Sequence, residues 1–160
     1  SHLLSVLPVF QMMGMAIQVE DRAVTIKGEL RPQPVTVETG PYPGFPTDLQ
    51  SPLMAVMAVG AGESLILENV FEGRYETAGE LRKLGAQIII EEKAAHVRGI
   101  SPLYGSRVEA KDLRGGAALV VAGLAAEGET VITGCHHIFR GYEDICRDLS
   151  SLGAQISKQQ

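Results

Sequence analysis

The chain has 160 residues, a formal net charge of −5, 45% hydrophobic residues and 21% charged residues. These values are typical of one soluble globular domain and argue against a general affinity for nucleic acid. No apolar run approaches the roughly 18 residues that span a membrane, and Cys135 and Cys146 form no disulfide framework, so we expect a reduced, cytoplasmic protein.

The first predicted elements precede residue 40. Apolar residues at helical spacing predict a helix over residues 2–13, which Pro8 should kink or shorten and Gly14 should end. Residues 16–19 and 23–26 predict two short strands around a turn, and residues 34–37 predict another strand.

A loop rich in proline and glycine, residues 41–50 (PYPGFPTDLQ), then leads into an apolar run. Its prolines stiffen the chain, and it delivers the carboxylate of Asp48 to the start of a helix. One interpretation is that Asp48 only caps that helix, which is the commonest use of Asp there. The other is that the loop presents Asp48 to a substrate.

Two types of helix are predicted after the loop. Residues 51–60 and 115–126 are apolar on nearly every side, which indicates helices buried all round. Residues 76–84 and 142–152 are amphipathic and should cover a sheet while facing water. Strands are predicted at residues 64–67, 87–90, 96–97, 107–110, 130–133 and 155–156.

This order of elements repeats, and so do short sequence motifs. The run LGAQI at residues 84–88 recurs at 152–156, and Asp-Leu precedes both buried helices. Arg74 and Arg140 also follow corresponding strands. Each unit reads strand, buried helix, strand, amphipathic helix, strand, strand, which predicts an α/β fold built of βαβαββ repeats.

The repeat predicts one partial domain over residues 1–160. Residues 1–30 would be the end of a first unit, 31–100 the second and 101–160 the third. Because the first unit lacks its buried helix, we expect a fragment of a larger protein with an apolar inner surface left open. Self-association is one way to cover such a surface.

Four motifs, at Phe45–Gln50, Val70–Arg74, Asp112–Arg114 and Arg140–Glu143, resemble the C-terminal part of the UDP-N-acetylglucosamine enolpyruvyl transferase family. The resemblance covers nearly the whole chain. It implies an inside-out α/β barrel domain of βαβαββ units around a local threefold axis. It also implies a role in peptidoglycan synthesis.

The resemblance further implies transfer of the enolpyruvyl group of phosphoenolpyruvate to the 3-hydroxyl of UDP-N-acetylglucosamine. Asp48 matches the family's aspartate at that hydroxyl and would take its proton. Arg114 and Arg140 match arginines that close onto phosphoenolpyruvate, and Arg74 matches another arginine of that site. Val70 matches a position whose backbone touches the sugar nucleotide.

The resemblance indicates no cofactor. The family's cysteine acid and a lysine near its true start have no counterpart here, so we expect the chain alone to be inactive without its missing N-terminal part. Adjacent His136 and His137 lack further ligands and are interpreted as structural rather than as a metal site. Cys135 and Cys146 are interpreted as packing residues.

Several alternatives remain open at this level. Arg114 could pair with Asp112 on the surface, and Arg74 and Arg140 could be solvated loop charges of little energetic value. The sister enzyme 5-enolpyruvylshikimate-3-phosphate synthase has the same repeat architecture. A stand-alone binding module of the same fold, without catalytic activity, is the third possibility.

Overall fold

The computed structural model describes residues 4–28 and 31–159. Its helices are α1 Leu7–Met12, α2 Gln50–Ala58, α3 Glu76–Lys83, α4 Leu113–Ala125, α5 His136–Phe139 and α6 Ile145–Ser151, and a 3-10 turn spans Thr47–Leu49. Its strands are β1 Ala16–Val19, β2 Val24–Lys27, β3 Thr36–Glu38, β4 Glu63–Leu67, β5 Gln87–Glu91, β6 Ala94–Arg98, β7 Leu103–Tyr104, β8 Arg107–Glu109, β9 Ala126–Glu127 and β10 Val131–Thr133.

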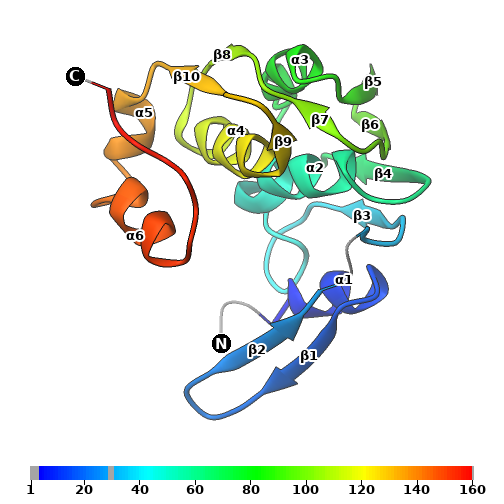
Figure 1. The fold of residues 1–160 in the computed structure, drawn as a ribbon. Helices are drawn as coiled ribbons and strands as arrows, with labels where there is room; N and C mark the ends of the chain where they lie inside the picture. Colours follow the sequence, from blue (N-terminus) through cyan, green and yellow to red (C-terminus); the bar gives the residue numbers. More distant parts are fainter. Residues whose placement is uncertain (1–3, 29–30, 160) are drawn as a thin grey trace.

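The same crossover occurs in both halves of the fold (Figure 1). Strand β3 pairs in parallel with β4 and is joined to it through α2, while β8 pairs in parallel with β10 and is joined to it through α4. The first crossover belongs to a four-stranded sheet of order β3-β4-β6-β5, in which β6 runs antiparallel to both neighbours. The order β3-α2-β4-α3-β5-β6 is the predicted βαβαββ order.

The two crossover helices lie side by side at the centre of the molecule (Figure 1). Every residue of α2 is buried or half-buried, as its apolar sequence predicts. The prediction that the second apolar helix is buried all round is wrong, because α4 buries one face against α2 and α3 and exposes Val121 and Leu124. An apolar sequence is necessary for complete burial, but neighbours on every side are needed as well.

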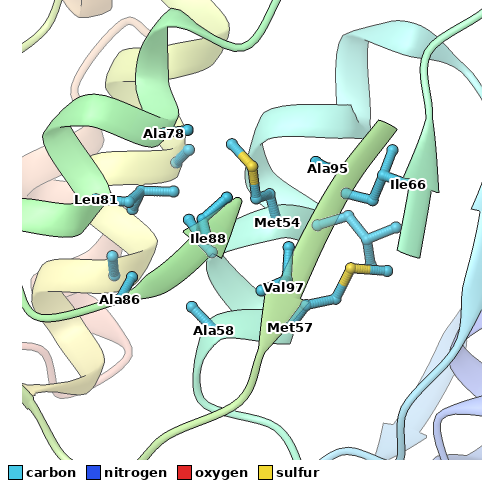
Figure 2. Packing of buried hydrophobic residues seen from close by; sticks show 14 of the residues in the cluster. Met54, Met57, Ala58, Ile66, Ala78, Leu81, Ala86, Ile88, Ala95 and Val97 are labelled. Atoms are coloured by element: carbon cyan, nitrogen blue, oxygen red, sulfur yellow. The ribbon is translucent and has the colours of Figure 1, made fainter. Parts of the chain in front are cut away.

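The main core lies between α2, α3 and the four-stranded sheet. Figure 2 shows Leu81 of α3, Ile88 of β5 and Met54 of α2 in this interior, and each is less than 5% exposed. On β5 the alternation places Ile88 inward and Ile89 outward, the pattern of a sheet with one face on the core. This packing holds α2 and the loop that precedes it.

The N-terminal predictions hold. Strands β1 and β2 form the predicted antiparallel hairpin, and Gly14 adopts φ 87° after α1. Of the two effects predicted for Pro8, the helix is shortened rather than kinked: α1 begins at Leu7, and Pro8 lies in its first turn, where its missing N–H costs nothing. The start of the predicted helix, at residues 2 and 3, lies outside the described residues.

Two C-terminal predictions are wrong. The amphipathic helix begins at Ile145 rather than at residue 142, because the side chain of Asp144 accepts the backbone N–H of Arg147 at 2.9 Å and caps it there. Residues 155–156 form no strand; Ile156 instead packs by its side chain against the small hydrophobic cluster of Ala110, Val120 and Ile138. The corresponding β5 is held by the following strand, β6, whereas no described segment pairs with residues 155–156.

Candidate functional site

The loop before α2 is held at both ends and is stiff between them. The ring of Phe45 is 6% exposed, and the backbone of residue 45 bridges to Thr39. The N–H of Gly44 donates to the carbonyl of Pro41 at 2.8 Å, and a Cβ at residue 44 would lie 2.9 Å from that oxygen, so the turn requires glycine. The loop ends in the 3-10 turn that contains Asp48.

Asp48 is not a helix cap. Neither the 3-10 turn nor α2 has a side-chain cap. The Asp48 carboxylate instead bridges two guanidinium groups, with Oδ1 3.0 Å from Nη2 of Arg74 and Oδ2 2.8 Å from Nη2 of Arg114. The capping interpretation of Asp48 is therefore wrong.

Asp112, which occupies the equivalent place before α4, does cap its helix. Its Oδ1 accepts the backbone N–H groups of Arg114 and Gly115, both at 2.8 Å. The guanidinium of Arg114 pairs with Asp48 rather than with Asp112. The same local pattern thus supports two different roles in the two repeats.

The ion pairs change the electrostatics of both partners. The hydrogen bond from Arg114 holds the pKa of Asp48 below its usual value, and Asp48 in turn raises the pKa of Arg114. The Asp48 side chain is 53% exposed, so these pairs contribute little to stability. Their significance is that Asp48 is an ionised acceptor at neutral pH.

The three arginines identified from the sequence line one open cavity of about 320 Å³. Arg74 enters from the loop before α3, Arg114 from the first turn of α4, and Arg140 from the residue after α5. Other lining residues are Ser51, Gly73, Glu76, Thr77, Asp112 and Leu113. Three guanidinium groups around one cavity can hold an anion with several oxygen atoms.

Val70 lies apart from this cluster. Within the described part of the chain, neither Val70 nor Asp48 is among the residues that line the cavity, although Asp48 reaches it through its two arginine partners. The side chain of Val70 is 40% exposed, and its backbone N–H donates to Glu68 at 2.9 Å. That N–H is therefore already used within the chain.

Sequence reasoning missed Thr47 and Glu68. Glu68 is 2% exposed and accepts the Thr47 hydroxyl at 2.9 Å, and that hydroxyl accepts Nη1 of Arg74 at 2.8 Å. Strand alternation was the available signal, because Ser64, Ile66 and Glu68 share the inward parity of β4 and its continuation. A buried carboxylate needs hydrogen-bond donors around it, so an acidic residue at an inward strand position predicts a buried hydrogen-bond network.

Across residues 4–28 and 31–159, no group of three or more His, Cys, Asp or Glu side chains could hold a metal ion. His136 and His137 belong to the short helix α5. Burial raises the pKa of the Cys146 thiol, the opposite of the shift in reactive cysteines. The same ranges contain no helix long and apolar enough to cross a membrane.

Comparisons with known proteins agree on one family. Residues 2–149 match the sequence model of EPSP synthase (3-phosphoshikimate 1-carboxyvinyltransferase). The chain is 43% identical over 159 residues to UDP-N-acetylglucosamine 1-carboxyvinyltransferase 3 of Symbiobacterium thermophilum, covering 99% of this chain and 38% of that protein. It is 46% identical over 151 residues to UDP-N-acetylglucosamine 1-carboxyvinyltransferase of Trichlorobacter lovleyi, covering 93% and 36%.

Solved structures give the same fold. The enolpyruvyl transferase NikO from Streptomyces tendae superimposes with a TM-score of 0.88 at 33% identity, covering 97% of this chain and 36% of that chain. EPSP synthase from Acinetobacter baumannii superimposes with a TM-score of 0.62 at 22% identity, covering 81% and 32%, which supports the fold alone. The chain spans little more than a third of the length of the curated relatives described here.

Proposed function

Because this chain belongs to the EPSP synthase family of enolpyruvyl transferases, we propose that it supplies part of the site of an enzyme of that family. The donor is phosphoenolpyruvate, and the acceptor is the 3-hydroxyl of UDP-N-acetylglucosamine. The names of the relatives at 43% and 46% identity support this acceptor over shikimate 3-phosphate. The repeat units proposed within the chain are residues 31–100 and 101–160, preceded by the end of another unit at 1–30.

The observation that carries the proposal is the Asp48 carboxylate bridging Arg74 and Arg114 beside a cavity that Arg140 also lines. Phosphoenolpyruvate carries a carboxylate and a phosphate, and planar guanidinium groups pair with both. In this proposal Arg74, Arg114 and Arg140 hold the donor, and Val70 contacts the sugar nucleotide through its backbone.

Asp48 is proposed as the general base. In the addition step the 3-hydroxyl oxygen bonds to C2 of phosphoenolpyruvate, C3 gains a proton from an acid, and Asp48 takes the hydroxyl proton. Loss of phosphate and of one C3 proton then restores the vinyl group on the sugar. The pKa of Asp48 is lowered mainly by its bond to Arg114, so binding of the donor to Arg114 would release the carboxylate and raise its basicity.

The test is ligand binding to the chain, since it spans little more than a third of the relatives. Millimolar phosphoenolpyruvate should shift the NMR signals of Arg74, Arg114 and Arg140, and Arg114→Ala should weaken binding. UDP-N-acetylglucosamine should shift signals around Asp48 and Val70. Absence of any shift at the arginines would overturn the donor site.

The acceptor is tested separately with shikimate 3-phosphate in place of UDP-N-acetylglucosamine. If only shikimate 3-phosphate perturbs the region of Asp48, the sister activity replaces the proposed one. If neither acceptor nor donor perturbs it, the stand-alone binding module becomes the better account. With UDP-N-acetylglucosamine as acceptor, the proposed setting is peptidoglycan synthesis in the cytoplasm.

A further inference from the structure

Glu68 is a buried carboxylate that lies behind the candidate site. It directly follows β4, is 2% exposed, and is satisfied by neutral donors. Its Oε1 accepts the Thr39 hydroxyl at 2.8 Å and the backbone N–H groups of Val70 and Phe71 at 2.9 and 3.1 Å. Its Oε2 accepts the Thr47 hydroxyl at 2.9 Å. A carboxylate can only accept hydrogen bonds. In each of these four bonds, therefore, Glu68 is the acceptor and the partner is the donor.

The bonds to Oε1 hold the loop that leads to Arg74. Oε1 accepts the backbone N–H groups of two successive residues, Val70 and Phe71. The preceding N–H, that of Asn69, donates to the hydroxyl of Thr39 at 2.9 Å. The ring of Phe71 lies under the guanidinium of Arg74, with Cζ 4.7 Å from the ring centroid. The stacking contact of Arg74 therefore depends on a residue that Glu68 positions.

The bond to Oε2 orients the other partner of Arg74. A threonine hydroxyl has one proton, and at residue 47 that proton points to Glu68. The oxygen lone pairs are left facing Arg74, whose Nη1 lies 2.8 Å away while its Nη2 bonds Asp48 at 3.0 Å. A continuous chain of bonds thus runs from Glu68 through Thr47 and Arg74 to Asp48.

We propose that Glu68 is a positioning residue that sets the polarity of the Thr47 hydroxyl, and through it holds Arg74 against Asp48. This inference rests on the proposed function for the role of Arg74 and Asp48 toward substrate. Glu68 itself touches no substrate; it acts from behind the cavity as the acceptor that terminates the chain.

The decisive variant is Glu68→Gln. The amide oxygen can keep the bonds made by Oε1, but the amide NH₂ takes the place of Oε2 and donates. The Thr47 hydroxyl then faces two donors and has to turn its proton elsewhere. Thr47→Val removes the hydroxyl at nearly constant shape, and Thr47→Ser keeps it.

The first readout is the side-chain Nε–H NMR signal of Arg74 in the free chain, which requires no ligand. Glu68→Gln and Thr47→Val should both move it toward the position of a solvated arginine, and Thr47→Ser should leave it near the wild-type value. The second readout is the Kd for phosphoenolpyruvate. Both disruptive variants should weaken binding about tenfold, which corresponds to about 1.4 kcal/mol. The double variant should be no weaker than either single variant.

The matched control is Glu80→Gln. Glu80 is 7% exposed and accepts the backbone N–H of Glu109 at 2.9 Å, outside the network described above. It should lower the unfolding midpoint without moving the Arg74 signal. If Glu68→Gln also lowers stability but leaves the Arg74 signal in place, Glu68 is only structural and the inference is wrong. If Glu68→Gln does not fold, the Arg74 signals of Thr47→Val and Thr47→Ser are compared instead. An unmoved signal in Thr47→Val would then contradict the inference.

The two proposals fail differently. If the wild-type chain binds no phosphoenolpyruvate while the Arg74 signal responds as expected, the proposed function fails and the positioning role stands. If phosphoenolpyruvate binds wild type, Glu68→Gln and Thr47→Val equally well, the positioning role fails and the anion site stands.

Discussion

Two leucines of α4 provide a direct test of how the inner helices pack. Leu119 is 1% exposed and faces the core, whereas Leu124 on the same helix is 46% exposed. Leu→Ala at either position changes helix propensity by the same small amount. Any difference in stability between the two variants therefore reports burial.

The magnitude follows from that exposure. Leu119→Ala removes fully buried methyl groups and leaves a cavity, for which we expect a loss of about 2–5 kcal/mol. Leu124→Ala removes a side chain that is already half in water and leaves no closed cavity, so we expect about 1 kcal/mol. With a difference of about 2 kcal/mol, the midpoint of Leu119→Ala should lie about 4–8 °C below that of Leu124→Ala in a chain of this size.

The assay is thermal unfolding by far-UV circular dichroism, repeated over a range of protein concentrations. Equal losses in the two variants would refute the reasoning, because they would mean that the exposed face of α4 is covered in solution. A midpoint that falls on dilution would then identify a second copy of the chain as the cover, in line with the expected self-association.

Three further predictions concern the site and its surroundings. Arg114→Ala should raise the pKa of Asp48, since their hydrogen bond is the main cause of its lowering; carboxyl NMR titration checks this, and an unchanged pKa contradicts it. The wild-type pair contributes stability at neutral pH that is lost as the pH falls through the lowered pKa. Gly115→Ala should lower the free energy of unfolding by about 1–3 kcal/mol, because the added Cβ would lie against the hydroxyl oxygen of Thr77. Gly79→Ala has open space around the added Cβ and should raise the free energy of unfolding by about 0.4–1 kcal/mol. Urea unfolding measures both changes, and two changes of the same sign would contradict this reasoning. Burial raises the pKa of Tyr75 to about 12 in the folded chain, whereas the unfolded chain has the ordinary value of about 10. Between these two pH values only the unfolded chain releases the phenol proton, so the free energy of unfolding falls as the pH rises. Tyr75→Phe should lose less stability than wild type over that window, and an equal loss would exclude Tyr75 as the cause.

Much of the fold was predictable because its signals are local. Gly14, the predicted end of the first helix, adopts φ 87° after α1, and β1 and β2 form the two predicted strands around a turn. The failures arose where an element depends on its neighbours. Residues 155–156 repeat the sequence of a strand but have no described strand beside them, and Leu124 is as apolar as a core residue yet remains 46% exposed.

The clearest division between sequence and tertiary structure is at Asp48 and Asp112. The sequence by itself determined that each acid precedes an apolar helix, that prolines stiffen the loop before Asp48, and that arginines occur at corresponding positions. Only the tertiary structure decided that Asp112 caps its helix while Asp48 pairs with Arg74 and Arg114, 26 and 66 residues away. A cap uses N–H groups within the next turn of the same helix, so sequence can suggest it. An ion pair between distant segments exists only after the helices and loops have packed, and the same is true of the buried Glu68 that terminates the network.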